Sequence, residues 1–122
     1  MKIKTEAKDL KNGVIEGLLE NKGVDITQID LSNIEYAVCK YFVLCTGTSN
    51  THVDSLARSV EKYVQENLGQ KVWRKEGLDN SQWVILDYVD VVVHIFQKEY
   101  REFYGLEALW ADAPQVTIDE VK

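Results

Sequence analysis

The fold is set by residues 83–96, which read Trp83-Val84-Ile85-Leu86-Asp87-Tyr88-Val89-Asp90-Val91-Val92-Val93-His94-Ile95-Phe96. Two acids and a tyrosine separate two apolar, β-branched runs, which is typical of a β-hairpin. With Tyr88 and Val89 in the loop, antiparallel register pairs Asp87 with Asp90. One face is then aliphatic and predicted to pack on a core. The other face is predicted to be a docking surface and carries Trp83, Ile85, Asp87, Asp90, Val92, His94 and Phe96.

The length and charge of the chain limit its function. At 122 residues it has room for one domain with its own core, without metals or disulfides. Its net charge of −6 disfavours binding through nucleic-acid phosphates and favours a basic protein partner. Because the sequence contains neither an apolar leader nor a membrane-length apolar run, we expect a cytoplasmic protein with no membrane contact. The two cysteines, Cys39 and Cys45, are predicted to be reduced thiols, with Cys45 in the core.

Hydrophobic periodicity and turn residues predict eight elements and a tail. They are a helix at 4–22, a strand at 26–31, a strand at 41–46, a helix after 47–50 that closes at 68–69, an edge strand at 71–75, the two hairpin strands, and a helix at 98–109. Residues 111–122 contain the only proline and are interpreted as a flexible acidic tail. We therefore predict one domain over residues 1–110.

This order of elements predicts the fold class α/β (α+β-like), with a mixed five-stranded sheet and helices mainly on one face. The helix at about 50–68 connects the second and third strands, so these two strands are expected to run parallel.

Two polar clusters leave chemical alternatives open. Gly47-Thr48-Ser49 follows a buried strand and either cradles a phosphate at a helix N-terminus or caps that helix. Asp87 and Asp90 either bind Mg²⁺, are solvated, or receive a basic side chain from a partner. Together the clusters allow an alternative function as a nucleotide-binding protein or nucleotidyltransferase.

The aromatic residues of the hairpin leave a similar choice. His94 has no nucleophile in a recognisable arrangement, so packing against Trp83 is favoured over a role as general base. Trp83 is either half-buried under a helix or an exposed interface anchor.

The sequence resembles a known family, the ribosomal silencing or Iojap-like factors. The likeness runs from about Gly23 to Trp110 and is carried by Asp25-Ile26, Ile29-Asp30-Leu31, Tyr41-Phe42-Val43, Cys45-Thr46-Gly47-Thr48-Ser49, Glu76-Gly77, Trp83, Leu86-Asp87-Tyr88, Asp90-Val91-Val92-Val93-His94-Ile95-Phe96, Arg101, Tyr104, Leu106-Glu107 and Leu109-Trp110. The resemblance implies a nucleotidyltransferase-like fold without the catalytic acids, and hence a protein that is not an enzyme and needs no cofactor.

The resemblance also implies a partner and a mode of action. Members bind the large ribosomal subunit through its protein fourteen and block joining of the small subunit, which represses translation when nutrients are limited. The partner-binding residues carried over to this chain are Trp83, Asp87, Tyr88, Asp90 and His94. Little direct nucleic-acid contact is expected. We also expect a homodimer, formed through the first or the last helix.

The chain departs from the family pattern at two positions. Lys40 stands where an aspartate is usual, and Val89 stands where the hairpin usually has glycine. Since a β-branched residue adopts a positive φ only at a cost, Val89 makes the assumed two-residue loop a point to test in the structure.

Overall fold

The computed structural model describes residues 5–118. In chain order the elements are α1 Ala7–Glu20, β1 Val24–Asp30, β2 Tyr41–Gly47, α2 Asn50–Leu68, β3 Arg74–Glu76, β4 Trp83–Asp87, β5 Val91–Gln97, α3 Lys98–Tyr104, α4 Leu106–Leu109 and β6 Gln115–Thr117.

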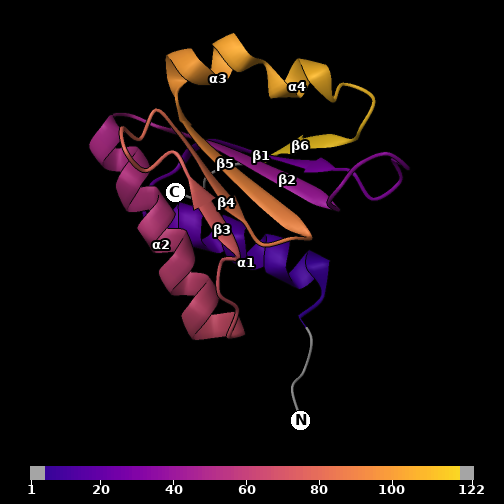
Figure 1. Cartoon of the computed structure of the whole chain (residues 1–122), viewed down its shortest axis with the longest axis horizontal. Coiled ribbons are helices and arrows are strands. Elements are labelled where there is room, and N and C mark those ends of the chain that lie inside the picture. Colours follow the sequence, from indigo (N-terminus) through magenta and orange to yellow (C-terminus); the bar gives the residue numbers. More distant parts are fainter. Residues whose placement is uncertain (1–4, 119–122) are drawn as a thin grey trace.

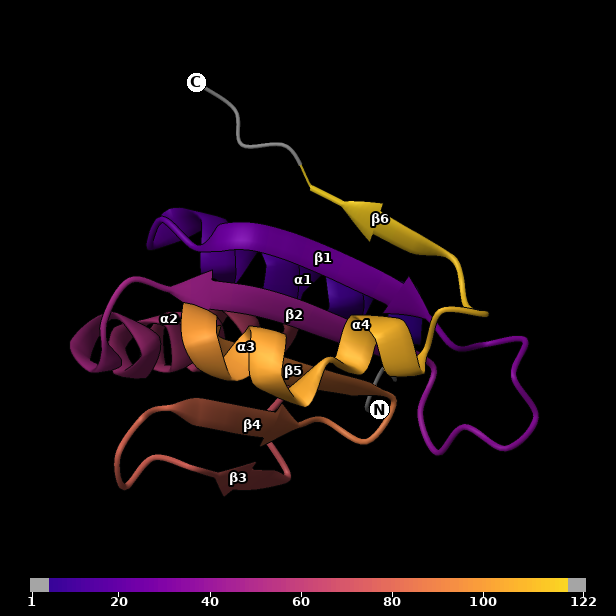
Figure 2. The ribbon, with the colours of Figure 1, turned by 90° about the horizontal axis from the view of Figure 1, so that it is seen from above.

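The six strands form one mixed sheet in the order β3-β4-β5-β2-β1-β6 (Figure 2). β2 and β5 are parallel neighbours in the middle, and all other neighbouring pairs are antiparallel. β2 and β3 point the same way, as predicted, but β5 and β4 lie between them. The central strands are therefore joined by long connections, while the two edges are formed by the shortest strands.

Helices lie on both sides of this sheet. The long helices α1 and α2 pack together against one face, and the short helices α3 and α4 lie over the other (Figure 1). Each face has its own hydrophobic cluster. The predicted fold class is confirmed, with most of the helical residues on one face, but α3 and α4 give the second face a partial cover.

Local sequence explains how α1 and α2 are placed. Ser49 caps α2 by accepting a hydrogen bond from the backbone N–H of His52, and Gly69 ends it in the left-handed conformation at φ 65°. Gly17 allows the two helices to approach closely, since a Cβ there would lie 2.9 Å from Cα of Val60. The glycine that weakens α1 as an isolated helix is thus required by its packing.

The predicted hairpin register is wrong by two residues, although the predicted faces are correct. Asp87 pairs with Val92 and Trp83 with Phe96, instead of with Asp90 and His94. The hairpin is closed by a hydrogen bond from the N–H of Tyr88 to the carbonyl of Val91, so the loop is Val89–Asp90. Because side chains alternate with a period of two, this shift leaves every strand residue on its predicted face.

Other boundaries also differ from the prediction. The sheet has six strands because Gln115–Thr117, expected in the flexible tail, pairs with β1 as β6. The helix predicted at 98–109 is broken at Gly105, whose φ is 58°. Residue 4 of the predicted first helix and residues 119–122 of the predicted tail lie outside the described residues, as do residues 1–3. Within residues 5–118 there is no helix with the length and apolar character needed to cross a membrane.

Candidate protein-binding site

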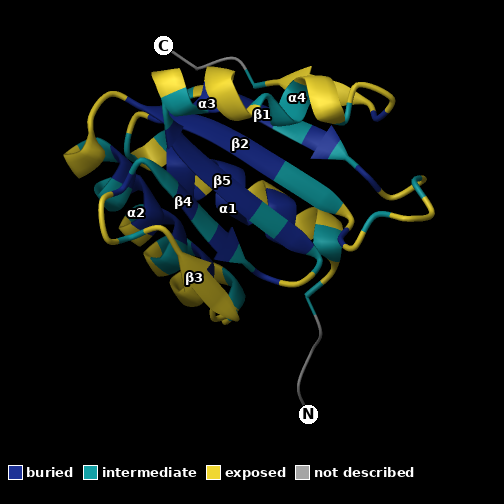
Figure 3. Ribbon diagram, turned by 45° about the horizontal axis from the view of Figure 1, so that its top comes forward, coloured by how far each residue is buried: buried dark blue, intermediate teal, exposed yellow. Residues whose placement is uncertain are grey.

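The predicted docking face lies on the α3/α4 side of the sheet. α3 and α4 cover only part of this side, and Figure 3 shows both helices as largely exposed beside a mostly buried sheet. Four apolar side chains on the strands are partly exposed here. We call them, with the acids at their edge, the open face: Phe42, Trp83, Ile85 and Val92, bordered by Asp87 and Asp90.

Trp83 is half-buried at the centre of an aromatic cluster. Its ring stacks on Phe96 at a centroid distance of 5.0 Å and contacts Tyr104 of α3 at 4.5 Å. Its indole Nε1 donates a hydrogen bond to Nδ1 of His94 over 3.1 Å. The indole is therefore held in one orientation, with part of its surface still accessible, which is the arrangement expected of an interface anchor.

His94 lies beneath Trp83 and is only 5% exposed. Because the indole can only donate, Nδ1 of His94 must accept, and the imidazole proton is on Nε2. Nε2 is buried and has no hydrogen-bond partner among the described residues, and the ring meets Phe42 edge-on at 4.6 Å. Burial lowers the pKa of His94 to about 4. The predicted packing against Trp83 is confirmed, and His94 acts on the open face by orienting the indole.

The two acids are not the opposed pair that the sequence predicts. The Asp87 carboxylate accepts a hydrogen bond from the N–H of Val89 over 2.8 Å, which fixes the turn. Asp90 is a loop residue whose backbone carbonyl accepts from the N–H groups of Lys40 and Tyr41. Both side chains are partly exposed, so they border the open face as separate negative charges.

Tyr88 lies on the opposite side of the sheet from Trp83. It is 7% exposed and belongs to the hydrophobic cluster under α1 and α2, where burial raises the pKa of its phenol. Within residues 5–118 its hydroxyl has no hydrogen-bond partner. The expectation that Tyr88 lies on or beside the open face is therefore wrong, because the loop starts one residue later than assumed.

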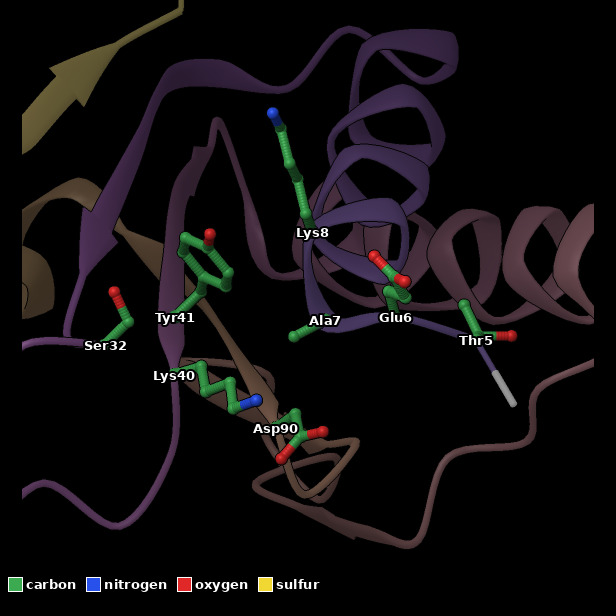
Figure 4. Close-up of a pocket in the computed structure, with 8 residues that line it drawn as sticks. All are labelled: Thr5, Glu6, Ala7, Lys8, Ser32, Lys40, Tyr41 and Asp90. Carbon is green, nitrogen blue, oxygen red and sulfur yellow. The ribbon is translucent and has the colours of Figure 1, made fainter.

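A hollow of about 540 Å³ opens beside Asp90, where the start of α1 meets the start of β2. Figure 4 shows the Lys40 side chain extending towards Asp90, with Tyr41 and the first residues of α1 around them. Its lining mixes Lys8 and Lys40 with Glu6 and Asp90. The lysine that departs from the family pattern thus adds a positive charge next to one of the acids of the open face.

The geometry argues against the nucleotide site considered from the sequence. β2 and β5 run parallel from the pair Tyr41–Val91 to the pair Gly47–Gln97, so Asp90 and Gly47 lie at opposite ends of the same two strands. Seven residues of strand separate these ends by roughly 20 Å. Ser49 is used as the helix cap. Among the described residues no group of three acidic, histidine or cysteine side chains is placed to hold a metal ion.

Cys39 and Cys45 are both buried, and Cys45 lies in the hydrophobic cluster under α1 and α2, as predicted. Burial raises the pKa of Cys39 to about 11, so its thiol stays protonated and unreactive at neutral pH.

Arg101, one of the residues that carry the family resemblance, fixes α3 and α4 to the sheet, a role that the sequence pattern did not predict. Its guanidinium is 8% exposed and donates to the carbonyl of Asp25 and to the hydroxyls of Thr27 and Thr46. It also donates two hydrogen bonds of 3.1 Å to the carboxylate of Glu107. The available signal was its place among the residues that carry the family resemblance, since α3 also contains Lys98, Glu99 and Glu102. Arg101 thereby sets the position of Tyr104 over Trp83.

Further apolar surface lies on α3 and α4 and on the loop that contacts them. Phe103 and Leu109 are 79% and 72% exposed on α3 and α4. Tyr36, from the loop between β1 and β2, stacks on Trp110 at 5.8 Å. The sequence indicated aromatic surface on the last helix but gave no sign that Tyr36 joins it.

The fold and this face define a small mixed α/β protein with an open, partly apolar sheet face. The family model described as "Ribosomal silencing factor during starvation" matches residues 4–122. The chain belongs to the ribosomal silencing factor family, as the sequence resemblance predicted. Membership gives it a role in translation regulation.

Individual relatives agree with this assignment. The chain is 40% identical to ribosomal silencing factor RsfS of Bacillus subtilis (strain 168) over 100 residues. The aligned region covers 82% of this chain and 83% of that protein. Its fold is similar to a crystal structure from Chromobacterium violaceum, with a TM-score of 0.82, 33% identity and coverage of 97% and 98%. A second crystal structure, from Bacillus halodurans, has a TM-score of 0.77 at 31% identity and covers 91% of this chain and 99% of the other.

Proposed function

We propose that this chain binds the large ribosomal subunit through its protein fourteen and, by occupying the subunit interface, blocks joining of the small subunit. The action is steric, requires no cofactor and no chemical step, and takes place in the cytoplasm when nutrients are limited. Family membership supports the ribosomal role.

The observation that carries the proposal is the held but accessible Trp83. Its indole is fixed by His94 and Tyr104, and it is surrounded by partly exposed apolar side chains with acids at the edge. A ribosomal protein is commonly basic, so Asp87 and Asp90 would complement its charge while the apolar centre is desolvated. In this proposal Trp83, Asp87 and Asp90 touch the partner, and His94 and Tyr88 support them from below.

Binding of purified protein fourteen and of each ribosomal subunit tests this proposal. We expect the chain to bind both the large subunit and isolated protein fourteen, and the small subunit not at all. Retention on the large subunit without affinity for protein fourteen would identify a different partner. Preferential binding to the small subunit would overturn the proposal.

A further inference from the structure

The segment Lys71–Lys75, which leads into the edge strand β3, carries the strongest local positive charge among the described residues. The segment Lys71-Val72-Trp73-Arg74-Lys75 has three cations and no acid, in a chain whose net charge is −6. All of these residues except Val72 are exposed. Such a segment stands out because the charge of the rest of the chain is strongly negative.

Trp73 is the unusual member of this segment. It is 62% exposed, and the guanidinium of Arg74 lies 4.4 Å from the centre of its ring. Lysines at a sheet edge are explained by protection against unwanted strand pairing, but an exposed tryptophan works against that protection. A tryptophan held by an adjacent arginine at a basic surface is instead the arrangement that stacks an unpaired base and binds its phosphates.

The cations of this segment are largely available to a ligand. Within the part of the chain that the structure describes, Lys71 and Arg74 form no ion pair, and Lys75 forms an exposed one with Glu61 at 3.4 Å. The nearest acids on the strands are Glu76, which follows the segment, and Asp87, which pairs with Arg74 in the sheet register. The positive surface therefore begins where the acidic border of the open face ends.

We propose that this edge, Lys71, Trp73 and Arg74, contacts ribosomal RNA beside the protein partner, with Trp73 stacking on an unpaired base and the two cations binding the backbone phosphates. The inference rests on the proposed function, because docking through the open face brings β3 to the rim of the interface. At that rim, the negatively charged molecule within reach of the cations would be the ribosomal RNA beside protein fourteen. It refines the expectation from composition, which allowed little nucleic-acid contact for the chain as a whole.

The test compares two probes, the intact large subunit and isolated protein fourteen, over a series of salt concentrations. The variants are Trp73→Ala and the double variant Lys71→Gln with Arg74→Gln. The matched control is Lys62→Gln with Lys98→Gln, which removes the same charge from exposed positions on α2 and α3. Thermal unfolding of each variant checks that the fold is retained.

We expect Trp73→Ala to weaken binding to the intact subunit at least about five-fold, the lower end for loss of one stacked base. The double variant should reduce the steepness of log affinity against log salt by about 1.4, for two lost contacts with single-stranded RNA phosphates. Affinity for isolated protein fourteen should not change for either variant, and the control should match wild type on both probes.

Equal losses on both probes would assign the edge to a protein contact and overturn the inference. An unchanged affinity and salt slope on the intact subunit would show that the edge stays in solvent. If wild type itself binds neither probe, the proposed function fails and the inference fails with it. Binding to the subunit without binding to protein fourteen would reject only that protein as the partner. The salt dependence of the variants on the intact subunit would still show whether the edge contacts RNA.

Discussion

The indole Nε1 of Trp83 donates a hydrogen bond to Nδ1 of His94 over 3.1 Å, and this bond joins the open face to the buried residue beneath it. The donor is partly accessible, whereas the acceptor is 5% exposed. A surface side chain is thus oriented by a core residue, which reduces the conformational entropy that Trp83 loses on binding.

Replacement of this indole should damage binding more than folding. We expect Trp83→Ala to weaken binding to the large subunit at least about thirty-fold, or about 2 kcal/mol, as for a central anchor. Trp83→Phe keeps a ring against Phe96 and Tyr104 but loses the bond to His94, so its affinity should be intermediate. Titration calorimetry with thermal unfolding as a fold control measures both. Wild-type affinity in a folded Trp83→Ala variant would remove Trp83 from the interface.

The charge of Asp87 can be separated from its role in the turn. Asp87→Asn keeps an oxygen that accepts from the N–H of Val89, so unfolding in urea should shift by less than about 1 kcal/mol. If Asp87 faces a basic partner, the same variant should weaken binding more at low salt than at high salt. A loss of affinity independent of ionic strength would contradict this electrostatic role. Asp87→Lys should magnify the salt effect but also disturb the turn.

The hairpin loop should be strained at Val89. Its φ is 77°, in the left-handed region that β-branched residues adopt at a cost, and its side chain is 56% exposed. We therefore expect Val89→Gly to raise the free energy of unfolding by about 1 kcal/mol. Val116→Gly is the control, since Val116 is similarly exposed in β6 without a positive φ and should lose stability. A destabilised Val89→Gly protein would show that the loop is not strained.

The buried imidazole of His94 predicts a pH-dependent stability. Burial lowers its pKa in the folded protein to about 4, below the ordinary value of 6.5. The unfolded chain therefore binds the proton first as pH falls. This contribution, on the order of 3 kcal/mol, is present above pH 6.5 and is lost progressively down to pH 4. Urea unfolding of wild type and His94→Gln at pH 4 to 7 measures it. Parallel pH profiles for the two proteins would contradict the assignment.

The exposed apolar side chains on α3 and α4 support the expected homodimer. Phe103 and Leu109 are largely exposed on adjacent helices, and such a patch is costly to leave in water. We predict a concentration-dependent dimer in sedimentation equilibrium, which Phe103→Ser with Leu109→Ser should convert to a monomer. A wild-type monomer at every concentration would reject the dimer. A dimer unaffected by the double substitution would place the contact elsewhere.

Much of the sheet was predictable from sequence because burial imposes short repeats. The alternation from Val84 to Leu86 and from Val91 to Ile95 gave the correct faces of the hairpin. Its register was not predictable, because it depends on which residues form the loop, and Val89 there adopts a conformation that its side chain disfavours. The same alternation, continued two residues past Leu86, would have placed Tyr88 in the core.

Other features have no periodic signal. β6 has three exposed residues and is placed by backbone hydrogen bonds and by Gln115, whose amide donates to carbonyls of Glu107 and Trp110. The position of β5 between β4 and β2 depends on packing across the whole sheet. The site was likewise predictable where side chains alternate, as at Trp83. It was not predictable where it depends on segments distant in sequence, such as Tyr36 on Trp110.

The central claim is that the open face occludes subunit joining. Its most direct test is sucrose-gradient sedimentation of purified small and large subunits with wild type or Trp83→Ala at equal concentration. We predict that wild type migrates with the large subunit and depletes joined ribosomes, while folded Trp83→Ala leaves joining intact. Normal joining in the presence of wild type bound to the large subunit would contradict occlusion.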